Sequence, residues 1–299
     1  MFQGVIPAVC TWFTEDGRLD LETQFAHADF LIEGGVHGLF FQGSGGEFAY
    51  MDAAERRDHA RAVVKHVAGR VPVFMGVSSN NADEAAALAR HAQEVGADAV
   101  VAVTPYFWAV NEDSLVAYYA IIGRATGLPL FAYNFPAVTN HQIGARLLNR
   151  IIETVPTLAG VKDTIDSQSH IRDLVVRVKG PHPTFSVMAG MDEYLLSTLT
   201  AGGDGVIGSF INFAPRTVVG LYDAFRQKDF DRVVALQRVI GRLSVVAVLS
   251  APPMSAFKEA ALQVMGRSLG TNYVRPPLGR VTPEGAARIR QALKEILGL

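Results

Sequence analysis

The chain has 299 residues, of which 49% are hydrophobic and 19% charged, so it has ample material for a buried core. The formal net charge is −2 and no basic run or stripe of Lys and Arg is present, so nucleic acid is not an expected partner. No apolar stretch approaches the ~20 residues of a membrane span, and the first residues lack the charged-then-apolar pattern of a targeting segment, so a cytoplasmic protein is expected.

Eight short apolar runs recur roughly every 30 residues, which is the size of a strand-and-helix unit. They predict strands at residues 5–10, 38–42, 71–77, 99–104, 128–133, 158–162, 185–190 and 205–210. The first run contains Cys10, the single cysteine, which has no partner for an internal disulfide and fits a reducing compartment. Because the run is apolar, Cys10 is expected to be a small buried core residue rather than a nucleophile.

Helical patterns fill the gaps between these runs. They predict helices at residues 20–33, 52–68, 81–95, 113–126 and 192–200, with glycine stop signals at their ends. Near-continuous apolar strands alternating with helices indicate a parallel sheet that is buried on both faces. Closure into a (β/α)8 barrel over residues 1–225 is the simplest solution at this length, and a doubly wound open sheet is the alternative.

The last part of the chain has more helices than such a barrel needs. Amphipathic segments follow at residues 216–227, 231–247, 253–265 and 283–297. One of them completes the barrel, so residues 226–299 are predicted to form a C-terminal helical cap.

The chemistry is expected to centre on the run that ends at Lys162. Strand side chains alternate between faces, so Gly160 and Lys162 point one way and Val161 the other. If Val161 packs outward against a helix, Lys162 points into the barrel mouth, where desolvation disfavours the charged amine. A neutral amine can attack a ketone and form a Schiff base, whose iminium accepts electrons. A surface lysine in an ordinary salt bridge is the alternative.

Further polar and aromatic side chains follow other strands, at the rim where barrel enzymes carry their chemistry. Residues 43–47 (GSGGE) form a turn whose N–H groups suit a carboxylate, with Ser44 as an added donor, unless the turn is a plain connection. Tyr133 can relay a proton if it faces the mouth, and is otherwise a core tyrosine. The aromatic residues 106–108 (YFW) are expected to pack beneath a loop, and the alternative is that they wall a pocket.

Dinucleotide and metal sites are not expected. Gly203, Gly205 and Gly208 match G-x-G-x-x-G, but they lie before and within a strand, whereas that fingerprint requires strand, turn and helix. No Walker loop is present, and the eight histidines are scattered without ligand spacing. The sequence therefore predicts no cofactor and no metal, and an aldol reaction without a metal needs an amine such as Lys162.

Three motifs, at residues 43–47 (GSGGE), 133–136 (YNFP) and 160–163 (GVKD), resemble the dihydrodipicolinate synthase/N-acetylneuraminate lyase family. The likeness runs nearly end to end, and within the family the chain is most similar to the 2-keto-3-deoxygluconate aldolases. The resemblance implies a class I aldolase that cleaves a 2-keto-3-deoxy sugar acid to pyruvate and an aldehyde. It also implies a homo-oligomer, a tetramer built as a dimer of dimers.

The resemblance implies a role for individual residues as well. Lys162 would be the Schiff-base lysine and Tyr133 the proton shuttle. Ser44 and the N–H of Gly45 would hold the pyruvate carboxylate. The further predicted substrate contacts are Tyr106, Gly190 and Ile207.

Three positions depart from the family pattern. Gly45 stands where a threonine is usual, so the N–H remains and a hydroxyl donor is lost. Phe107 stands where family members send a tyrosine across a subunit interface, which leaves a water, Tyr106 or a substrate hydroxyl to complete the proton relay. Val138 stands where dihydrodipicolinate synthases use an arginine to hold the carboxylate of the aldehyde substrate. Its absence disfavours the alternative that this protein condenses pyruvate with an aldehyde, as those synthases do.

The sequence leaves two other outcomes open. A dehydratase would use the same lysine on a keto-deoxy acid and retain every carbon in one molecule. A sugar-acid binding or sensing protein would use the same pocket without turnover, an alternative motivated by the missing hydroxyls at Gly45 and Phe107.

Overall fold

The structure is a computed structural model that describes residues 1–266 and 270–299. Its strands are β1 (Gly4–Pro7), β2 (Leu39–Phe41), β3 (Val73–Gly76), β4 (Ala99–Val103), β5 (Leu130–Asn134), β6 (Leu158–Asp163), β7 (Ser186–Ala189) and β8 (Gly205–Gly208). Its α-helices are α1 (Leu21–Glu33), α2 (Ala53–Val67), α3 (Ala82–Glu94), α4 (Glu112–Ala125), α5 (Pro136–Thr139), α6 (Ala145–Thr154), α7 (Gln168–Leu174), α8 (Leu195–Ala201), α9 (Pro215–Gln227), α10 (Phe230–Ala247), α11 (Met254–Met265) and α12 (Pro283–Leu297).

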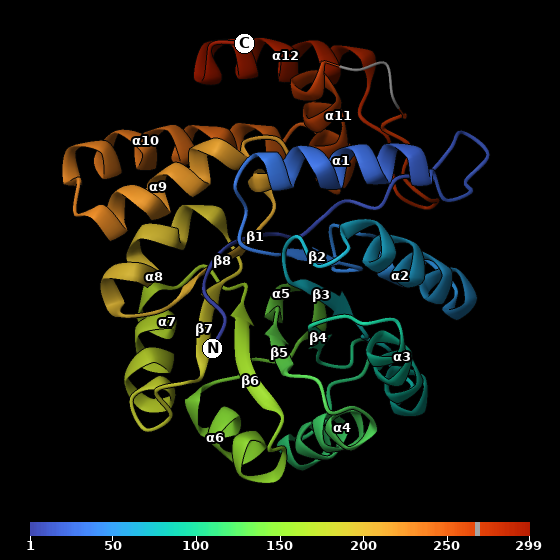
Figure 1. The fold of residues 1–299 in the computed structure, drawn as a ribbon, viewed down its shortest axis with the longest axis vertical. Coiled ribbons are helices and arrows are strands. Elements are labelled where there is room, and N and C mark those ends of the chain that lie inside the picture. The colour runs from blue at the N-terminus through green and yellow to red at the C-terminus, as the bar shows by residue number, and fades with distance from the viewer. Residues whose placement is uncertain (267–269) are drawn as a thin grey trace.

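The strands form one parallel sheet that closes into a barrel. Their order is β1-β8-β7-β6-β5-β4-β3-β2, with each strand hydrogen-bonded to the next. A parallel bridge between Ala8 and Phe40 joins the two ends of the sheet, and Val9 N donates to Phe40 O at 2.8 Å. Helices surround the strands (Figure 1). The predicted (β/α)8 barrel is therefore confirmed, and the open sheet is excluded.

Polar caps explain where several barrel helices begin. In each of them the side chain before the first helical residue accepts a backbone N–H of the first turn, as seen at Asp20, Asp52, Asn81, Asn111 and Ser167. At α2 the cap is reciprocal, because Glu55 also accepts from the N–H of Asp52. These caps satisfy backbone N–H groups of the first turn and so fix where each helix begins.

The apolar side chains divide into two clusters because strand residues alternate between faces. The outer cluster lies between the strands and the helices and contains Val161. The inner cluster fills the barrel and includes Ile6, Phe40, Phe74, Phe131, Tyr133, Met188 and Ile207. The expectation that Val161 packs outward is therefore confirmed. Cys10 also belongs to the outer cluster and is fully buried, and burial raises the pKa of its thiol to about 12, as expected for a core residue.

All eight predicted strands are present, with ends that differ by a few residues. Helices α5, α6 and α7 lie where no helix is predicted. The signal for α6 is nevertheless present, because Leu147, Leu148 and Ile151 share its buried face at helical spacing. Helix α7 has seven residues and continues directly into a π-helix over Val175–Lys179, whose wider turn departs from the regular 3.6-residue period.

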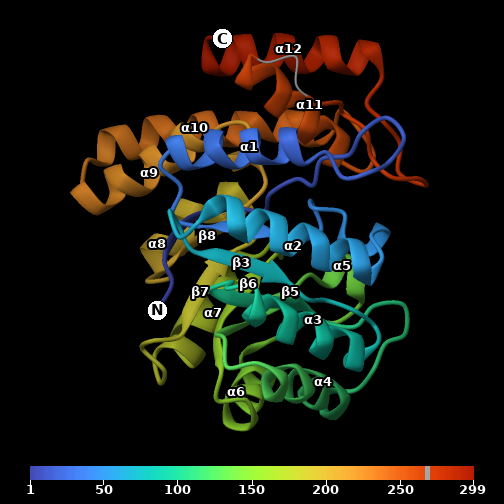
Figure 2. The same ribbon diagram turned by 45° about the vertical axis from the view of Figure 1, so that its right-hand side comes forward.

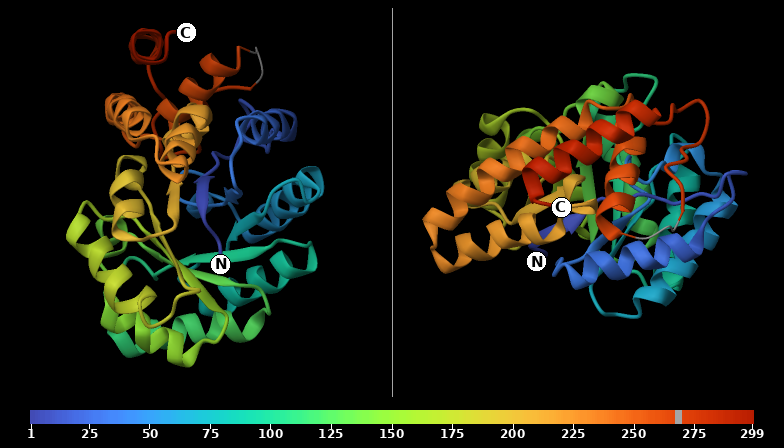
Figure 3. Two further views of the ribbon diagram at one scale, coloured as in Figure 1. Left: turned by 60° about the vertical axis from the view of Figure 1, so that its left-hand side comes forward. Right: turned by 90° about the horizontal axis from the view of Figure 1, so that it is seen from above.

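The C-terminal helices lie together on one side of the barrel. Helix α9 contacts β1 and continues the ring of barrel helices, and α10 packs against it. Helices α11 and α12 stack beyond them, with α12 at the top of Figure 1, and the other views keep this arrangement (Figures 2 and 3). The predicted boundary between residues 225 and 226 falls inside α9. Among the helices of the described residues, none combines the length and the apolar character that a membrane crossing demands.

The packing of the barrel interior requires glycine at position 160. A β-carbon added there would lie 2.3 Å from Cε1 of Phe131, whose ring is fully buried. We therefore expect Gly160→Ala to lower the free energy of unfolding by about 1–3 kcal/mol, the usual cost of overpacking a core. Gly241 in α10 is the matched control, because a β-carbon there meets nothing within 4 Å and alanine is favoured over glycine inside a helix. Urea unfolding of both variants tests this, and a Gly160→Ala protein as stable as Gly241→Ala would contradict it.

Candidate active site

Lys162 lies inside the barrel mouth beside Tyr133. The two residues are register partners on β6 and β5. Lys162 is 3% exposed, and its Nζ lies 4.1 Å from the centroid of the Tyr133 ring and 5.2 Å from that of Phe40. In the part of the chain that the structure describes, no carboxylate lies within ion-pair distance of this amine. The alternative of a surface lysine in a salt bridge is therefore excluded, because the amine is enclosed by aromatic rings.

A cavity of about 430 Å³ opens above this pair, at the C-terminal ends of the strands. This volume is within the range of small-molecule sites. Its polar lining comes from Ser44, Glu47, Tyr50, Tyr106, Tyr133, Thr139, Lys162, Thr164 and Ser209, and an apolar wall comes from Pro252, Pro253, Met254 and Phe257. Lys162 is the only cationic residue among the described residues that line it. The C-terminal segment thus contributes directly to the site.

The glycine-rich turn after β2 borders the cavity with Ser44 and Gly45. Ser44 Oγ lies 3.4 Å from the Tyr133 hydroxyl, which links the turn to the lysine pair. Within residues 1–266 and 270–299, the backbone N–H groups of Ser44 and Gly45 donate to no protein acceptor. Adjacent free N–H groups at a turn form a site for an anion. The turn can therefore bind a carboxylate close to the amine.

The outward face of the same strand carries a buried polar network. Asp163 accepts from Asn134 Nδ2 at 2.6 Å and pairs with His170 Nδ1 at 2.9 Å. Asn134 Oδ1 in turn accepts the N–H of Ile143 at 2.8 Å. Burial lowers the pKa of His170, but the hydrogen bond and charge of Asp163 raise it by more, so the net shift is upward. This network fixes which face of β6 turns outward.

Other polar groups meet the site at the ends of β6, β7 and β8. Thr164 follows Lys162 on the same face, and its buried Oγ1 has no hydrogen-bond partner among the described residues. Asp192 accepts the N–H groups of Ser209 and Phe210 at 2.8 and 3.0 Å, and burial raises its pKa to about 6. Neither Thr164 nor Ser209 is assigned from the sequence. The two-residue spacing from Lys162 is a signal that identifies Thr164 in retrospect.

Most of the residues predicted for the site border one cavity. These are Ser44, Gly45, Tyr106, Tyr133, Lys162 and Gly190. Tyr106 is half-buried, and burial raises its pKa, which keeps the phenol protonated. Ile207 is different, because it is fully buried in the inner cluster and does not border the cavity, so its part in binding stays a prediction.

The aromatic residues after β4 do not pack as expected. Phe107 is 80% exposed and Trp108 is 76% exposed, and the two rings contact each other edge to face. Phe107 also has a φ of 84°, in the left-handed region. The expectation of packing beneath a loop is therefore wrong for these two side chains, because the connection to α4 carries them away from the barrel.

No group of three or more His, Cys, Asp or Glu residues at metal-binding geometry occurs within the described part of the chain. The reactive groups at the mouth are an enclosed amine, a phenol and free N–H donors. An amine without a counter-ion suits covalent chemistry with a carbonyl group, and barrel enzymes carry their chemistry at this end. Fold and site together define an enzyme of the class I aldolase and lyase type.

Comparison with known proteins identifies the family. The chain belongs to the Dihydrodipicolinate synthetase family, whose sequence pattern matches residues 1–296. It is 39% identical to YagE of Escherichia coli K12, a candidate 2-dehydro-3-deoxy-D-gluconate aldolase, over 99% of this chain and 97% of that protein. It is 40% identical to YjhH of the same organism, a candidate 2-dehydro-3-deoxy-D-pentonate aldolase, over 98% of this chain and 96% of that protein.

Solved structures agree with this assignment. The crystal structure of YagE in complex with pyruvate superposes with a TM-score of 0.96 at 38% identity, covering 99% of both chains. The dihydrodipicolinate synthase of Thermotoga maritima superposes with a TM-score of 0.92 at 28% identity, covering all of both chains. The family resemblance inferred from three motifs is therefore confirmed over the whole chain.

The raised pKa of His170 has a consequence for stability. A histidine whose pKa is higher in the folded than in the unfolded state adds stability that is complete below the unfolded pKa, about 6.5, and is lost as pH rises through the folded pKa. We therefore expect the stability difference between the unchanged protein and His170→Gln to be larger at pH 5.5 than at pH 8.5. Urea midpoints at the two pH values measure it. A difference that is constant or grows with pH would show that the Asp163 pair does not raise this pKa.

Proposed function

We propose that the protein is a Schiff-base lyase that cleaves a 2-keto-3-deoxy sugar acid, of the 2-keto-3-deoxygluconate type, to pyruvate and an aldehyde. The observation that carries the proposal is the enclosed Lys162 amine, 4.1 Å from the Tyr133 ring and without a carboxylate partner among the described residues. The names of YagE and YjhH as candidate aldolases of such acids support the substrate class.

The lysine performs the covalent step. The Nζ of Lys162 adds to the C2 ketone, and loss of water gives an iminium. When the C3–C4 bond breaks, its electron pair becomes the C2–C3 double bond of an enamine, and the iminium nitrogen becomes neutral. C4 becomes the carbonyl carbon of the aldehyde, which leaves, a proton adds to C3, and water then adds to C2 and releases pyruvate with the free amine.

Tyr133 moves the proton that the cleavage requires. As the aldehyde forms, the C4 hydroxyl must lose its proton, and in this proposal the phenol oxygen of Tyr133 accepts it. Ser44 Oγ, 3.4 Å from that oxygen, supports a relay in which the Tyr133 proton passes on through the Ser44 hydroxyl. This relay does not use a hydroxyl at position 107, where the chain has an exposed phenylalanine.

The turn at Ser44 and Gly45 orients the keto acid. Its free N–H groups and the Ser44 hydroxyl can hold the C1 carboxylate, which places C2 toward Lys162. Val138 and the apolar wall from residues 252–257 also line the cavity, and apart from Lys162 the described lining has no cation to match a second negative group. This supports a neutral, hydroxyl-bearing aldehyde as the leaving fragment rather than one that carries a carboxylate.

The same proposal includes a homo-oligomer, a tetramer as the family resemblance implies. The support within the chain is a set of exposed apolar side chains, Phe107, Trp108 and Val110 in the connection after β4 and Val138 in α5. Large exposed aromatic groups of this kind commonly mark a protein–protein contact.

Covalent capture of pyruvate tests the central step. Incubation with pyruvate and borohydride is expected to reduce the Schiff base and add a pyruvyl-derived mass to the peptide that contains Lys162. Lys162→Ala is expected to abolish the adduct and leave the fold intact, as followed by circular dichroism. Mass spectrometry after digestion locates the adduct. Folded protein without an adduct at Lys162 would overturn the mechanism.

Loss of the phenol tests the proton relay. Tyr133→Phe is expected to lower kcat for cleavage of 2-keto-3-deoxygluconate by ~10²–10⁴, the usual effect of losing a general acid or base. Adduct formation with pyruvate should persist, because the amine is retained. Detection of pyruvate and of the aldehyde measures kcat and also separates cleavage from dehydration, since a dehydratase retains every carbon. An unchanged kcat would remove Tyr133 from the mechanism.

A further inference from the structure

The turn that borders the cavity is held between two residues in an unusual backbone conformation. Gln42 and Glu47 flank residues 43–46, and their φ angles are 58° and 56°. This left-handed region is sparsely populated by residues other than glycine, and it persists only where the surroundings hold it. Both side chains are also buried. The contacts that hold these two residues therefore determine the shape of the turn.

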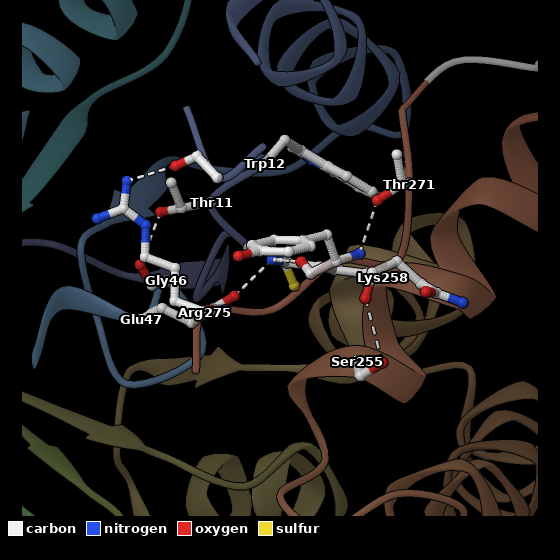
Figure 4. A network of polar contacts seen from close by, with 12 residues as sticks. Thr11, Trp12, Gly46, Glu47, Ser255, Lys258, Thr271 and Arg275 are labelled. Carbon is white, nitrogen blue, oxygen red and sulfur yellow. Dashed lines mark hydrogen bonds and ion pairs between the residues drawn. The ribbon is translucent and has the colours of Figure 1, made fainter. Parts of the chain in front are cut away.

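Glu47 is held by the C-terminal segment. Its Oε1 forms an ion pair with Lys258 of α11, and its Oε2 accepts the backbone N–H of Arg275 at 2.9 Å (Figure 4). Both side chains of the ion pair are fully buried. Lys258 also donates to Tyr273 O at 2.7 Å and lies over the Phe13 ring, 4.9 Å from its centroid. The pair has no access to solvent and serves an internal role.

Glu47 connects this ion pair to the turn through its backbone. Its N–H donates to Ser44 O at 3.1 Å, and Thr11 Oγ1 donates to Gly46 O at 2.7 Å. A shift of Glu47 would therefore shift Ser44, whose hydroxyl lies next to Tyr133. The ion pair thus acts on the part of the turn that faces the cavity.

The other end of the turn is fixed from the barrel itself. Arg56 of α2 donates to Gln42 Oε1 at 3.1 Å, and Gln42 Nε2 donates back to Arg56 O at 2.7 Å. The same guanidinium donates to Ser78 O and Gly76 O at the end of β3. With this end fixed by the barrel, the position of the other end depends on the C-terminal segment.

We propose that Lys258 is a positioning residue, which acts through Glu47 to hold the Ser44–Gly45 turn in the conformation that binds the substrate carboxylate. The inference rests on the proposed function of that turn. Lys258 does not itself border the cavity, so it acts without touching substrate. A buried ion pair adds little stability over an apolar pair of the same shape, whereas removal of one partner leaves an uncompensated charge. The pair thus serves geometry more than stability.

The experiment measures the pyruvate concentration that gives half-maximal borohydride trapping at Lys162. Lys258→Met is expected to raise it by about 10- to 100-fold, the effect of moving a binding group by about 1 Å. The matched control is Lys179→Met, which breaks the Lys179–Asp204 ion pair, 2.8 Å long and largely buried, at the opposite end of the barrel. It is expected to lower the melting temperature and leave the half-maximal concentration unchanged.

A second variant covers the case in which Lys258→Met does not fold. Glu47→Gln keeps the size of the side chain but has a single oxygen, whereas Glu47 offers one oxygen to Lys258 and the other to Arg275 N. It is expected to raise the half-maximal concentration as well. The double variant Lys258→Met/Glu47→Gln is expected to be less impaired than Lys258→Met, because it leaves no unpaired buried charge.

The outcomes separate the two proposals. Suppose that the unchanged protein and Lys179→Met form the adduct, and that folded Lys258→Met and Glu47→Gln reach half-maximal trapping at the same pyruvate concentration as the unchanged protein. Lys258 then has only a structural role, and the inference is overturned. In that case the proposed lyase mechanism stands. Absence of an adduct on the unchanged protein would instead overturn the proposed function and this inference with it.

Discussion

The two-residue alternation of β6 is the constraint on which the site depends. It turns Lys162 into the barrel mouth and Asp163 outward, where Asn134 and His170 bind the carboxylate. A slip of one residue would exchange the faces, placing a carboxylate in the cavity and an amine among the apolar side chains of the outer cluster. Both results would bury a charge without a suitable partner. The outer hydrogen-bond network therefore secures the register of the strand, and through it the position of the reactive amine.

The C-terminal helices are part of the site as much as of the scaffold. Phe257 of α11 borders the cavity, and the next residue, Lys258, pairs with Glu47 beneath the glycine-rich turn. One turn of helix thus closes a wall of the pocket and contacts the element that faces the amine. The rim of a barrel is built from the separate loops that follow its strands. Here a helix outside the barrel contributes to two functions at that rim, enclosure of the cavity and the proposed binding of the carboxylate. This explains why the extra helices pack so closely against the mouth.

Local patterns predicted most of the fold and the core of the site. The apolar runs place all eight strands, and alternation alone places Lys162 inward and Val161 outward. The polar residues that line the cavity could also be predicted, since Ser44 and Tyr133 lie at the C-terminal ends of apolar runs and such ends meet at one rim of a barrel. The Glu47–Lys258 ion pair could not be predicted from the sequence, because 211 residues separate the two side chains and no periodic pattern links them. The exposure of Phe107 and Trp108 could not be predicted either, because it follows from the path of the connection between β4 and α4 rather than from composition.

The distribution of charge in the cavity argues for the kind of acid that fits it. N–H dipoles bind an anion without adding a full positive charge to the site. The turn at Ser44 and Gly45 offers such dipoles. Apart from Lys162 the described lining has no cation, and Val138 and the proline-rich wall are apolar, so a second anionic group would be buried without a partner. One anionic end and a neutral, hydroxylated tail is the charge pattern of a keto-deoxy sugar acid. The family fold alone carries no such preference, because it resides in the side chains at the rim.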